Sequence, residues 1–471
     1  MIHKFKPKSE FSRNVLTLMT GTTIAQAIPI AISPILTRIY TPEDFGIFAL
    51  YMSIASIMAA VATGRYELAI MLPKKDEDAI NIVTLSIVMS FFVSFISFLI
   101  VFIFNSEITT LLGTSEISNW LYFVPITVLL TGIYQSFNYW NNRQKQYKRL
   151  ATNKIMQSGT TATTNLGMGF SGFGSAGLII GSIMGQGFAT VFLGKNILKS
   201  NKSLLGKVNK LKMFVLAKKY IDYPKKSAIG AFFNVLAYKV EIILLSIFYM
   251  PYFLGLYYFV NRFVNIPKQF LSSSIWQVFL ANSGQSIQSI FNTKVYKQKK
   301  ILRYSTYPII TGIFIYTDLF IFVFGSDWSD ATTFISPLVI AMHINFIVAS
   351  FSLFVLINRP DAEMVFNILL ALVKILAIVM SYYIWKDILY TIIVFSTTQF
   401  IMFYILGSWN YKQLEKSIFY FSKIYLSYFI PSLIVLFLLT IFFSEFILIQ
   451  KLLMYMFINL LYFGVIKYVK L

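Results

Sequence analysis

The sequence predicts an all-α polytopic membrane protein with about fourteen transmembrane helices. Of its 471 residues, 57% are apolar and only 13% are charged, which is too little charge for the surface of a soluble chain of this length. Apolar runs of about 20 residues, enough for a helix to cross ~30 Å of hydrocarbon, recur from Val15 to Phe463. The net charge of +21 is spread over short segments between these runs, which argues against nucleic acid as a partner.

The first apolar run follows the basic segment MIHKFKPKSEFSRN. It lacks a small-residue cleavage site in the usual place, so we expect a retained span and not a removed signal peptide. The predicted spans are 14–39, 45–63, 79–104, 118–138, 153–171, 176–197, 226–249, 254–282, 303–324, 331–357, 363–385, 388–408, 424–443 and 447–466.

Lysine and arginine alternate between successive loops, and this alternation predicts the topology. One set of loops is basic and includes the run from Lys199 to Lys226, whereas the other set is mostly acidic, with Lys386 as its clear base. By the positive-inside rule the basic loops and both termini are cytoplasmic. The outer loops are short, so they leave no room for the external domain that membrane glycan polymerases usually need.

A spacing at the end of the first span recurs in the second half of the chain. The shared positions are Tyr40, Pro42 and Gly46 in RIYTPEDFGIF, and Tyr249, Pro251 and Gly255 in YMPYFLGLYYF. Because these tight corners follow the first and seventh spans, we predict two six-helix lobes related by a pseudo-two-fold axis along the membrane normal. The predicted domains are the first lobe (1–200), a basic cytoplasmic linker (201–225), the second lobe (226–410) and two additional transmembrane helices (411–471).

Polar residues share helix faces in the second lobe. The stripes are Asn234, Tyr238 and Glu241 in the seventh span, Tyr258, Asn261, Arg262, Asn265 and Lys268 in the eighth, Thr311 and Asp318 in the ninth, and Asn367, Lys374 and Ser381 in the eleventh. A charge at the bilayer centre costs ~2.5 to 3.5 kcal/mol, so these side chains should face water or a partner. We interpret the stripes, together with Lys239, as the wall of a net basic cavity for an anionic substrate. The alternative is a set of buried ion pairs, such as Glu241 with Lys374 or Asp318 with Arg262, that only hold the bundle together.

Other polar residues lie outside these stripes. Arg65 and Glu67 stand at the inner end of the second span, and Arg38 stands at the outer end of the first. Each is interpreted either as part of the cavity or as an interfacial side chain that snorkels to the headgroups. His343, in the tenth span, is interpreted as a proton-sensitive residue or as a hydrogen-bonded core group.

The segment 159–187 is rich in glycine, and Gly177, Gly181 and Gly185 lie four residues apart, which predicts close helix packing. It is not a phosphate loop, because GxxxxGK followed by Ser or Thr does not occur in the chain. With no Cys and two His, a metal cluster is not expected either. We therefore expect no cofactor.

Three segments together resemble a known family. They are ILTRIYTPEDFGIFALY, GRYELAIMLPKKDEDA and SAGLIIGSIMGQG. The chain resembles the Wzx-like polysaccharide repeat-unit flippases of the multidrug, oligosaccharidyl-lipid and polysaccharide (MOP) exporter superfamily. The resemblance is strongest over residues 10–200 and continues through GLYYFVNRFVNIPKQF.

This resemblance implies a MATE-like, two-lobed transporter of the bacterial inner membrane. It would move undecaprenyl-pyrophosphate-linked oligosaccharide by alternating access, for O-antigen or capsular polysaccharide assembly, beside a polysaccharide polymerase and a chain-length regulator. The implied cationic lumen is assigned to Arg262, Lys268 and Lys374, with Lys239, Asn261, Asn265, Tyr258, Arg65 and Arg38 as further substrate-binding candidates. The implied coupling to H⁺ or Na⁺ is assigned by position to Glu241, Asp318 and His343.

Other functions stay open at this point. Another exporter of the superfamily could carry the peptidoglycan lipid precursor or a drug, although a net basic cavity disfavours cationic drugs. A membrane glycan polymerase is disfavoured by the short outer loops, and a non-transporting scaffold by the costly charges within the membrane.

Overall fold

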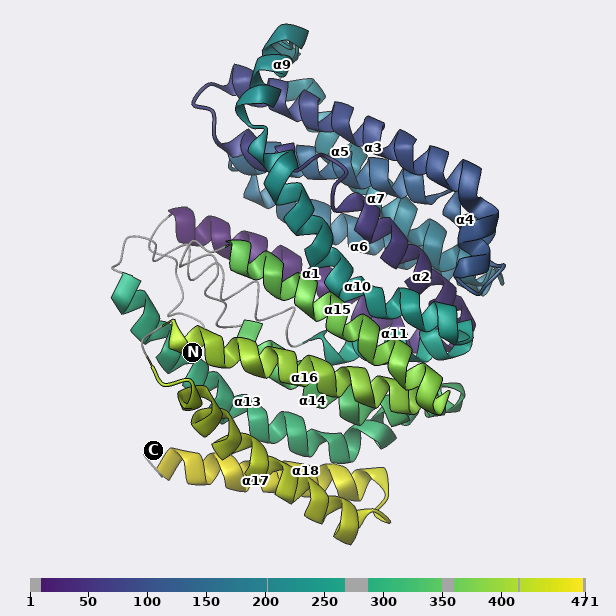
Figure 1. The fold of residues 1–471 in the computed structure, drawn as a ribbon, viewed down its shortest axis with the longest axis vertical. Coiled ribbons are helices and arrows are strands. Elements are labelled where there is room, and N and C mark those ends of the chain that lie inside the picture. The colour runs from purple at the N-terminus through teal and green to yellow at the C-terminus, as the bar shows by residue number, and fades with distance from the viewer. Residues whose placement is uncertain (1–9, 201, 267–286, 350–359, 414–415, 469–471) are drawn as a thin grey trace. The chain divides into compact units, whose positions relative to one another are not determined.

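The computed structural model describes residues 10–200, 202–266, 287–349, 360–413 and 416–468 (Figure 1). Helix dominates these ranges, and no β-strand occurs in them. The described chain divides by its contacts into two compact units, one ending at Gly255 and the other beginning at Leu256. This confirms the all-helical fold class that the composition predicted.

The first unit contains ten complete helices among its described residues and the start of an eleventh. They are α1 (Glu10–Ile39), α2 (Pro42–Ala59), α3 (Asp76–Leu111), α4 (Ile117–Leu121), α5 (Val124–Arg143), α6 (Tyr147–Phe170), α7 (Ser175–Ser200), α8 (Lys202–Leu205), α9 (Lys210–Lys219), α10 (Ala228–Phe248) and the beginning of α11 (Pro251–Val264). Short 3-10 and π segments, η2 (Tyr66–Met71) and η3 (Tyr223–Ser227), lie between them. Within this unit α6 packs on both α1 and α7, and α5 packs on both α3 and α7.

The second unit takes the rest of α11 and then continues with long helices. They are α13 (Ile287–Phe324), α14 (Ile335–Ala349), α15 (Pro360–Trp385), α16 (Ile388–Lys412), α17 (Phe419–Phe443) and α18 (Leu448–Tyr468), with the 3-10 segment η4 (Ser326–Phe334) before α14. Here α16 packs on α14, α15 and α17, while α13 packs on α14, α17 and α18.

Each predicted span overlaps a helix, although parts of 254–282 and 331–357 lie outside the described residues. Among the described residues, 11 helices are long and apolar enough to cross a membrane. The remaining predicted spans coincide with α2, α6 and α11, which do not meet that length and composition within the described ranges. The chain is therefore a multi-pass membrane protein.

The corner between α1 and α2 is built by side chains that cap both helix ends. Thr41 caps the start of α2, where its backbone N–H and the Asp44 carboxylate are 3.0 Å apart in a reciprocal capping box. Pro42 occupies the first turn, where a missing N–H costs nothing. Arg38 donates from Nη1 to the Pro34 carbonyl at 2.9 Å, in the last turn of α1. The tight corner predicted for RIYTPEDFGIF is confirmed.

Tyr40 fixes this corner to α6. Its hydroxyl donates to the Asn165 carbonyl at 2.6 Å, and the side chain is buried. Burial, reinforced by the nearby Asp44 charge, raises the pKa of Tyr40 to about 12. The hydroxyl therefore stays protonated and remains a donor at any physiological pH.

The sequence suggested that Gly46 helps to form the corner. Gly46 lies instead inside α2, at a point where another stretch of backbone crosses the helix. A Cβ on Gly46 would overlap the carbonyl of Pro251 and lie 3.2 Å from the Gly255 nitrogen. A Cβ on Gly255 would in turn overlap the carbonyl of Pro42 and lie 3.0 Å from the Gly46 nitrogen. The two copies of the repeated spacing thus contact each other reciprocally, as a local two-fold relation requires.

The glycine stripe of α7 packs against α6, as the four-residue spacing predicted. A Cβ on Gly177 would lie 3.1 Å from Met168 Cβ and overlap the Tyr40 hydroxyl. Added Cβ atoms on Gly181 and Gly185 would overlap side chains of Asn165 and Thr161. These glycines therefore let the two helix backbones approach, which is the usual use of small residues between membrane helices.

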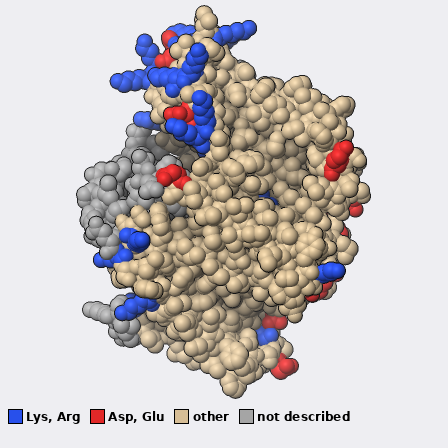
Figure 2. Space-filling view, in the orientation of Figure 1, with Lys and Arg blue, Asp and Glu red and all other residues tan. Residues whose placement is uncertain are grey.

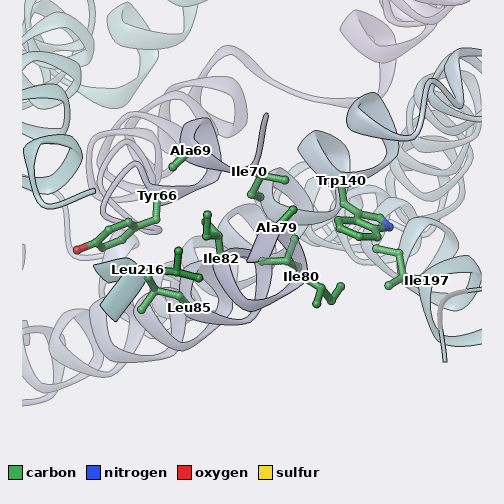
Figure 3. Close-up of a cluster of buried hydrophobic side chains, with 11 residues drawn as sticks. Tyr66, Ala69, Ile70, Ala79, Ile80, Ile82, Leu85, Trp140, Ile197 and Leu216 are labelled. Atoms are coloured by element: carbon green, nitrogen blue, oxygen red, sulfur yellow. The ribbon is translucent and has the colours of Figure 1, made fainter. Parts of the chain in front are cut away.

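A buried apolar cluster joins five segments of the first unit, one of them α7 through Ile197 (Figure 3). Tyr66 comes from η2, Ile80 from the start of α3, Trp140 from the end of α5 and Leu216 from α9. The Tyr66 hydroxyl also donates to the Ala217 carbonyl at 3.1 Å. This cluster fixes α9 on the beginning of α3.

Candidate functional site

The stripe predicted for the eighth span lies on the described part of α11, except that Asn265 is the residue just after the helix. Tyr258, Asn261, Arg262 and Asn265 are all partly buried there. Asn265 donates from Nδ2 both to the Asn261 carbonyl and to Asn261 Oδ1, each at 2.7 Å. The two amides therefore form one hydrogen-bonded ridge beside Arg262. Lys268 lies outside the described residues.

The heptad stripe of α15 is fully enclosed. Lys374 and Ser381 are 0% exposed and Asn367 is 3% exposed, whereas Leu376 and Met380, on the opposite face of the helix, are each 59% exposed. Ser381 donates to Thr391 Oγ1 of α16 at 3.1 Å, so the stripe faces protein and not lipid. Hence the predicted shared face exists, and Lys374 is sealed from solvent in this conformation.

Lys239 and Glu241 both lie on α10 in the first unit. Glu241 is 5% exposed and Lys239 is partly buried. A carboxylate this enclosed inside a membrane helix is costly, which is why such groups commonly carry function.

In the pair of Arg65 and Glu67, the glutamate is buried. The interpretation of Glu67 as a side chain that snorkels to the headgroups is therefore wrong. Glu67 is 1% exposed, lies 3.3 Å from Arg65 Nη1, and accepts a hydrogen bond from the Thr63 hydroxyl. Arg65 adopts a left-handed backbone with φ of 61°, which is unusual for a residue with a Cβ. The geometry is that of a buried acid paired with a partly exposed arginine, in a tight turn between α2 and η2.

Arg38 is exposed and donates to the carbonyl of Pro34, as described above. This contact matches a helix-end role, while its assignment to substrate stays a prediction.

Asp318 pairs with a residue that the sequence interpretation did not consider. Lys451 Nζ of α18 lies 2.7 Å from Asp318 Oδ2 of α13. The pair that the sequence suggested, with Arg262, is not the one that Asp318 forms among the described residues. Lys451 stands near the start of the last apolar run, a position that could have identified it as a charge within the membrane.

His343 is fully buried in α14, and its Nδ1 lies 3.1 Å from the Tyr425 hydroxyl of α17. Its ring also stacks on Phe429, with centroids 6.4 Å apart. Its Nε2 has no hydrogen-bond partner among the described residues. The contact with Tyr425 matches the core-group interpretation, while a coupling role is untested.

Lys154 is a further cation on a membrane helix that sequence reasoning missed. It lies on α6 and donates from Nζ to the Thr22 hydroxyl of α1 at 3.0 Å. The neighbouring Asn153 is fully buried. The sequence signal was a lysine at the start of the predicted span 153–171, which resembles an ordinary interfacial lysine.

The long apolar helices define a multi-pass membrane protein with an all-helical fold. It is similar to the lipid II flippase MurJ in an inward closed conformation, with a TM-score of 0.68 over 95% of this chain and 98% of that chain at 14% identity. It is also similar to an inward-facing multidrug resistance MATE family transporter of the MOP superfamily, with a TM-score of 0.63 over 85% of this chain and 99% of that chain at 11% identity. The MATE multidrug transporter DinF-BH gives a TM-score of 0.59 at 14% identity, covering 84% of this chain and 94% of that chain.

Residues 35–333 match the family described as polysaccharide biosynthesis protein. The match covers more than half of the chain, so the protein belongs to this family, and its fold is that of the MOP superfamily. A search of curated protein sequences found no significant match.

Proposed function

We propose that the protein is a flippase that moves undecaprenyl-pyrophosphate-linked oligosaccharide repeat units across the bacterial inner membrane, for O-antigen or capsular polysaccharide assembly. The observation that carries this proposal is the combination of a polysaccharide biosynthesis family match with a flippase-like fold over 95% of the chain. Both termini are placed in the cytoplasm by the positive-inside rule.

The charge of the substrate explains why such a protein would keep cations within the membrane. A pyrophosphate cannot enter hydrocarbon, whereas a polyprenyl tail can remain there. Arg262 is suited to bidentate contacts with phosphate oxygens, and Lys374 offers a point charge. Because Lys374 is 0% exposed here, its use requires a conformational change that opens α15, as alternating access would provide.

An ion gradient is the proposed source of energy, with Glu241 as the first candidate for coupling. It is enclosed on α10, and a buried carboxylate within a membrane helix is the kind of group that binds a coupling H⁺ or Na⁺. In proteoliposomes we expect transport to require a proton or sodium gradient and to weaken in Glu241→Gln. Undiminished transport without any gradient would refute the coupling.

The substrate is tested by deleting the gene in its own organism. We expect loss of surface polysaccharide and accumulation of the lipid-linked repeat unit on the cytoplasmic side, with restoration by the wild-type gene. Accumulation of the peptidoglycan lipid precursor with cell lysis would instead support a precursor flippase. An unaltered glycan with increased sensitivity to cationic drugs would support a drug exporter.

A further inference from the structure

The helix α9 has two apolar faces, and only one of them is covered. Met213, Leu216, Ala217 and Tyr220 pack in the cluster with α3 and η2. Leu211, Phe214 and Val215 lie on the other side at helical spacing and are 77%, 60% and 62% exposed. In a helix that is fixed in place, three adjacent exposed apolar side chains indicate a surface that is covered by something else.

The helix is held rigidly, so this exposure is not that of a loose linker. Asn209 caps its start by accepting from the Leu211 N–H at 2.8 Å, and the Asn209 N–H donates to the buried Asn81 at 2.9 Å. Lys212 Nζ lies 2.7 Å from Asp78 at the start of α3, and Lys207 pairs with Glu77. These contacts fix the orientation of α9 and so keep the face with Leu211, Phe214 and Val215 directed away from α3.

Lysines surround the outer apolar face. Lys210, Lys218 and Lys219 of α9 are exposed and form no ion pair among the described residues. Lys218 lies over the Phe214 ring, 4.7 Å from its centroid. Figure 2 shows Lys and Arg gathered where α9 and the start of α3 lie in Figure 1. Apolar side chains ringed by lysine are the pattern of a helix that lies in a membrane interface.

The place where α9 packs on α3 is the part of α3 that we expect at the level of the lipid headgroups. The acids Asp76 to Asp78 begin α3, and its exposed apolar side chains begin at Val88, which is 49% exposed. Ten residues of helix span about 15 Å, and α9 packs on this stretch, next to Ile82 and Leu85. It therefore lies between the acidic helix start and the surface that faces hydrocarbon.

We propose that α9 binds anionic phospholipid headgroups of the leaflet on the lysine-rich side, with Leu211, Phe214 and Val215 inserted at the acyl boundary. Lipid is the occupant that the charge favours, because the outer lysines lack acidic partners within the described chain and a bilayer must begin beside the lipid-facing part of α3. This inference is independent of which substrate the protein carries.

The chain contains no Cys, so a single introduced thiol reports on one position. We would place an environment-sensitive fluorophore on Phe214→Cys in the full-length protein and reconstitute it in nanodiscs of phosphatidylcholine with or without phosphatidylglycerol. Quenching by lipids with a nitroxide near the headgroup is expected for this label, and it should increase with phosphatidylglycerol. The same label on Ser203→Cys, an exposed residue of α8 outside the proposed lipid-binding face, serves as the reference position.

When Lys218→Gln and Lys219→Gln are added to the protein labelled at Phe214→Cys, phosphatidylglycerol should no longer increase the quenching. The matched charge control is Lys74→Gln with Lys75→Gln, two exposed lysines before α3, and it should retain the increase. Quenching of the Phe214 label no stronger than that of the Ser203 label would overturn the proposal and leave the face to a soluble partner. Two results would refute selective binding of anionic lipid by α9. One is equal quenching with and without phosphatidylglycerol, and the other is that the control pair loses the increase in quenching as fully as the Lys218 and Lys219 variant does.

Discussion

Lys451 Nζ lies 2.7 Å from Asp318 Oδ2 and joins α18 to α13. The lysine side chain is 12% exposed and the aspartate 35%. The two helices that the sequence treated as an addition belong to the second unit, where α18 is joined to α13 by this ion pair and α17 contacts α14 through Tyr425 and His343. The pair gives Asp318 a role in holding two helices together, while its role in coupling stays a prediction.

This pair gives the first prediction. Asp318→Asn or Lys451→Met should each lower the free energy of unfolding by about 1–3 kcal/mol, between the values for surface and buried pairs. The double variant should recover part of the loss, because it leaves no single charge behind. Thermal unfolding in detergent measures both effects. Gradient-driven transport that survives in the double variant would remove Asp318 from coupling.

The crossing of Gly46 and Gly255 gives the second prediction. Gly46→Ala or Gly255→Ala places a methyl group against a backbone carbonyl, which cannot turn away as a side chain can. We expect a lower unfolding temperature and reduced amounts in the membrane for both variants. The matched control is Gly167→Ala on α6, where a Cβ meets nothing within 4 Å. It should be neutral or stabilising by about 0.5–1 kcal/mol, and equal losses in all three variants would contradict the close crossing.

Lys374 gives the third prediction. Lys374→Met keeps the length of the side chain and removes the charge from a fully enclosed site. We expect loss of surface polysaccharide without loss of protein from the membrane, and the same result for Arg262→Ala. Lys74→Gln, at an exposed position, should leave the polysaccharide unchanged. Normal polysaccharide in both Lys374→Met and Arg262→Ala would remove these residues from the mechanism.

Arg65 gives the fourth prediction, through its left-handed backbone with φ of 61°. Arg65→Ala and Arg65→Gly both break the contact with Glu67, and both should be less stable than the wild type. Since only Gly adopts this backbone without strain, the Ala variant should be about 1 kcal/mol less stable than the Gly variant. Chemical or thermal unfolding of the two proteins side by side checks this difference. Equal stabilities would show that the turn relaxes around the new residue.

Local pattern was enough for several features of the site. The heptad of Asn367, Lys374 and Ser381 predicted one helix face, and burial confirms it, because a helix rotates by a fixed angle per residue. The four-residue spacing of Gly177, Gly181 and Gly185 predicted close packing for the same reason. In both cases the period of the helix alone decides which side chains share a face.

The sequence by itself determined the membrane class, the helices and the repeated corner, since each follows from apolar length, capping residues and helical period. Only the tertiary structure decided that Gly46 serves a backbone crossing, that Glu67 is buried, and that Asp318 binds Lys451. It also turned part of the basic linker into α9, with a covered and an uncovered face. These outcomes depend on which segments meet in space, and residues 133 positions apart, as in the Asp318 pair, share no local pattern that could predict it.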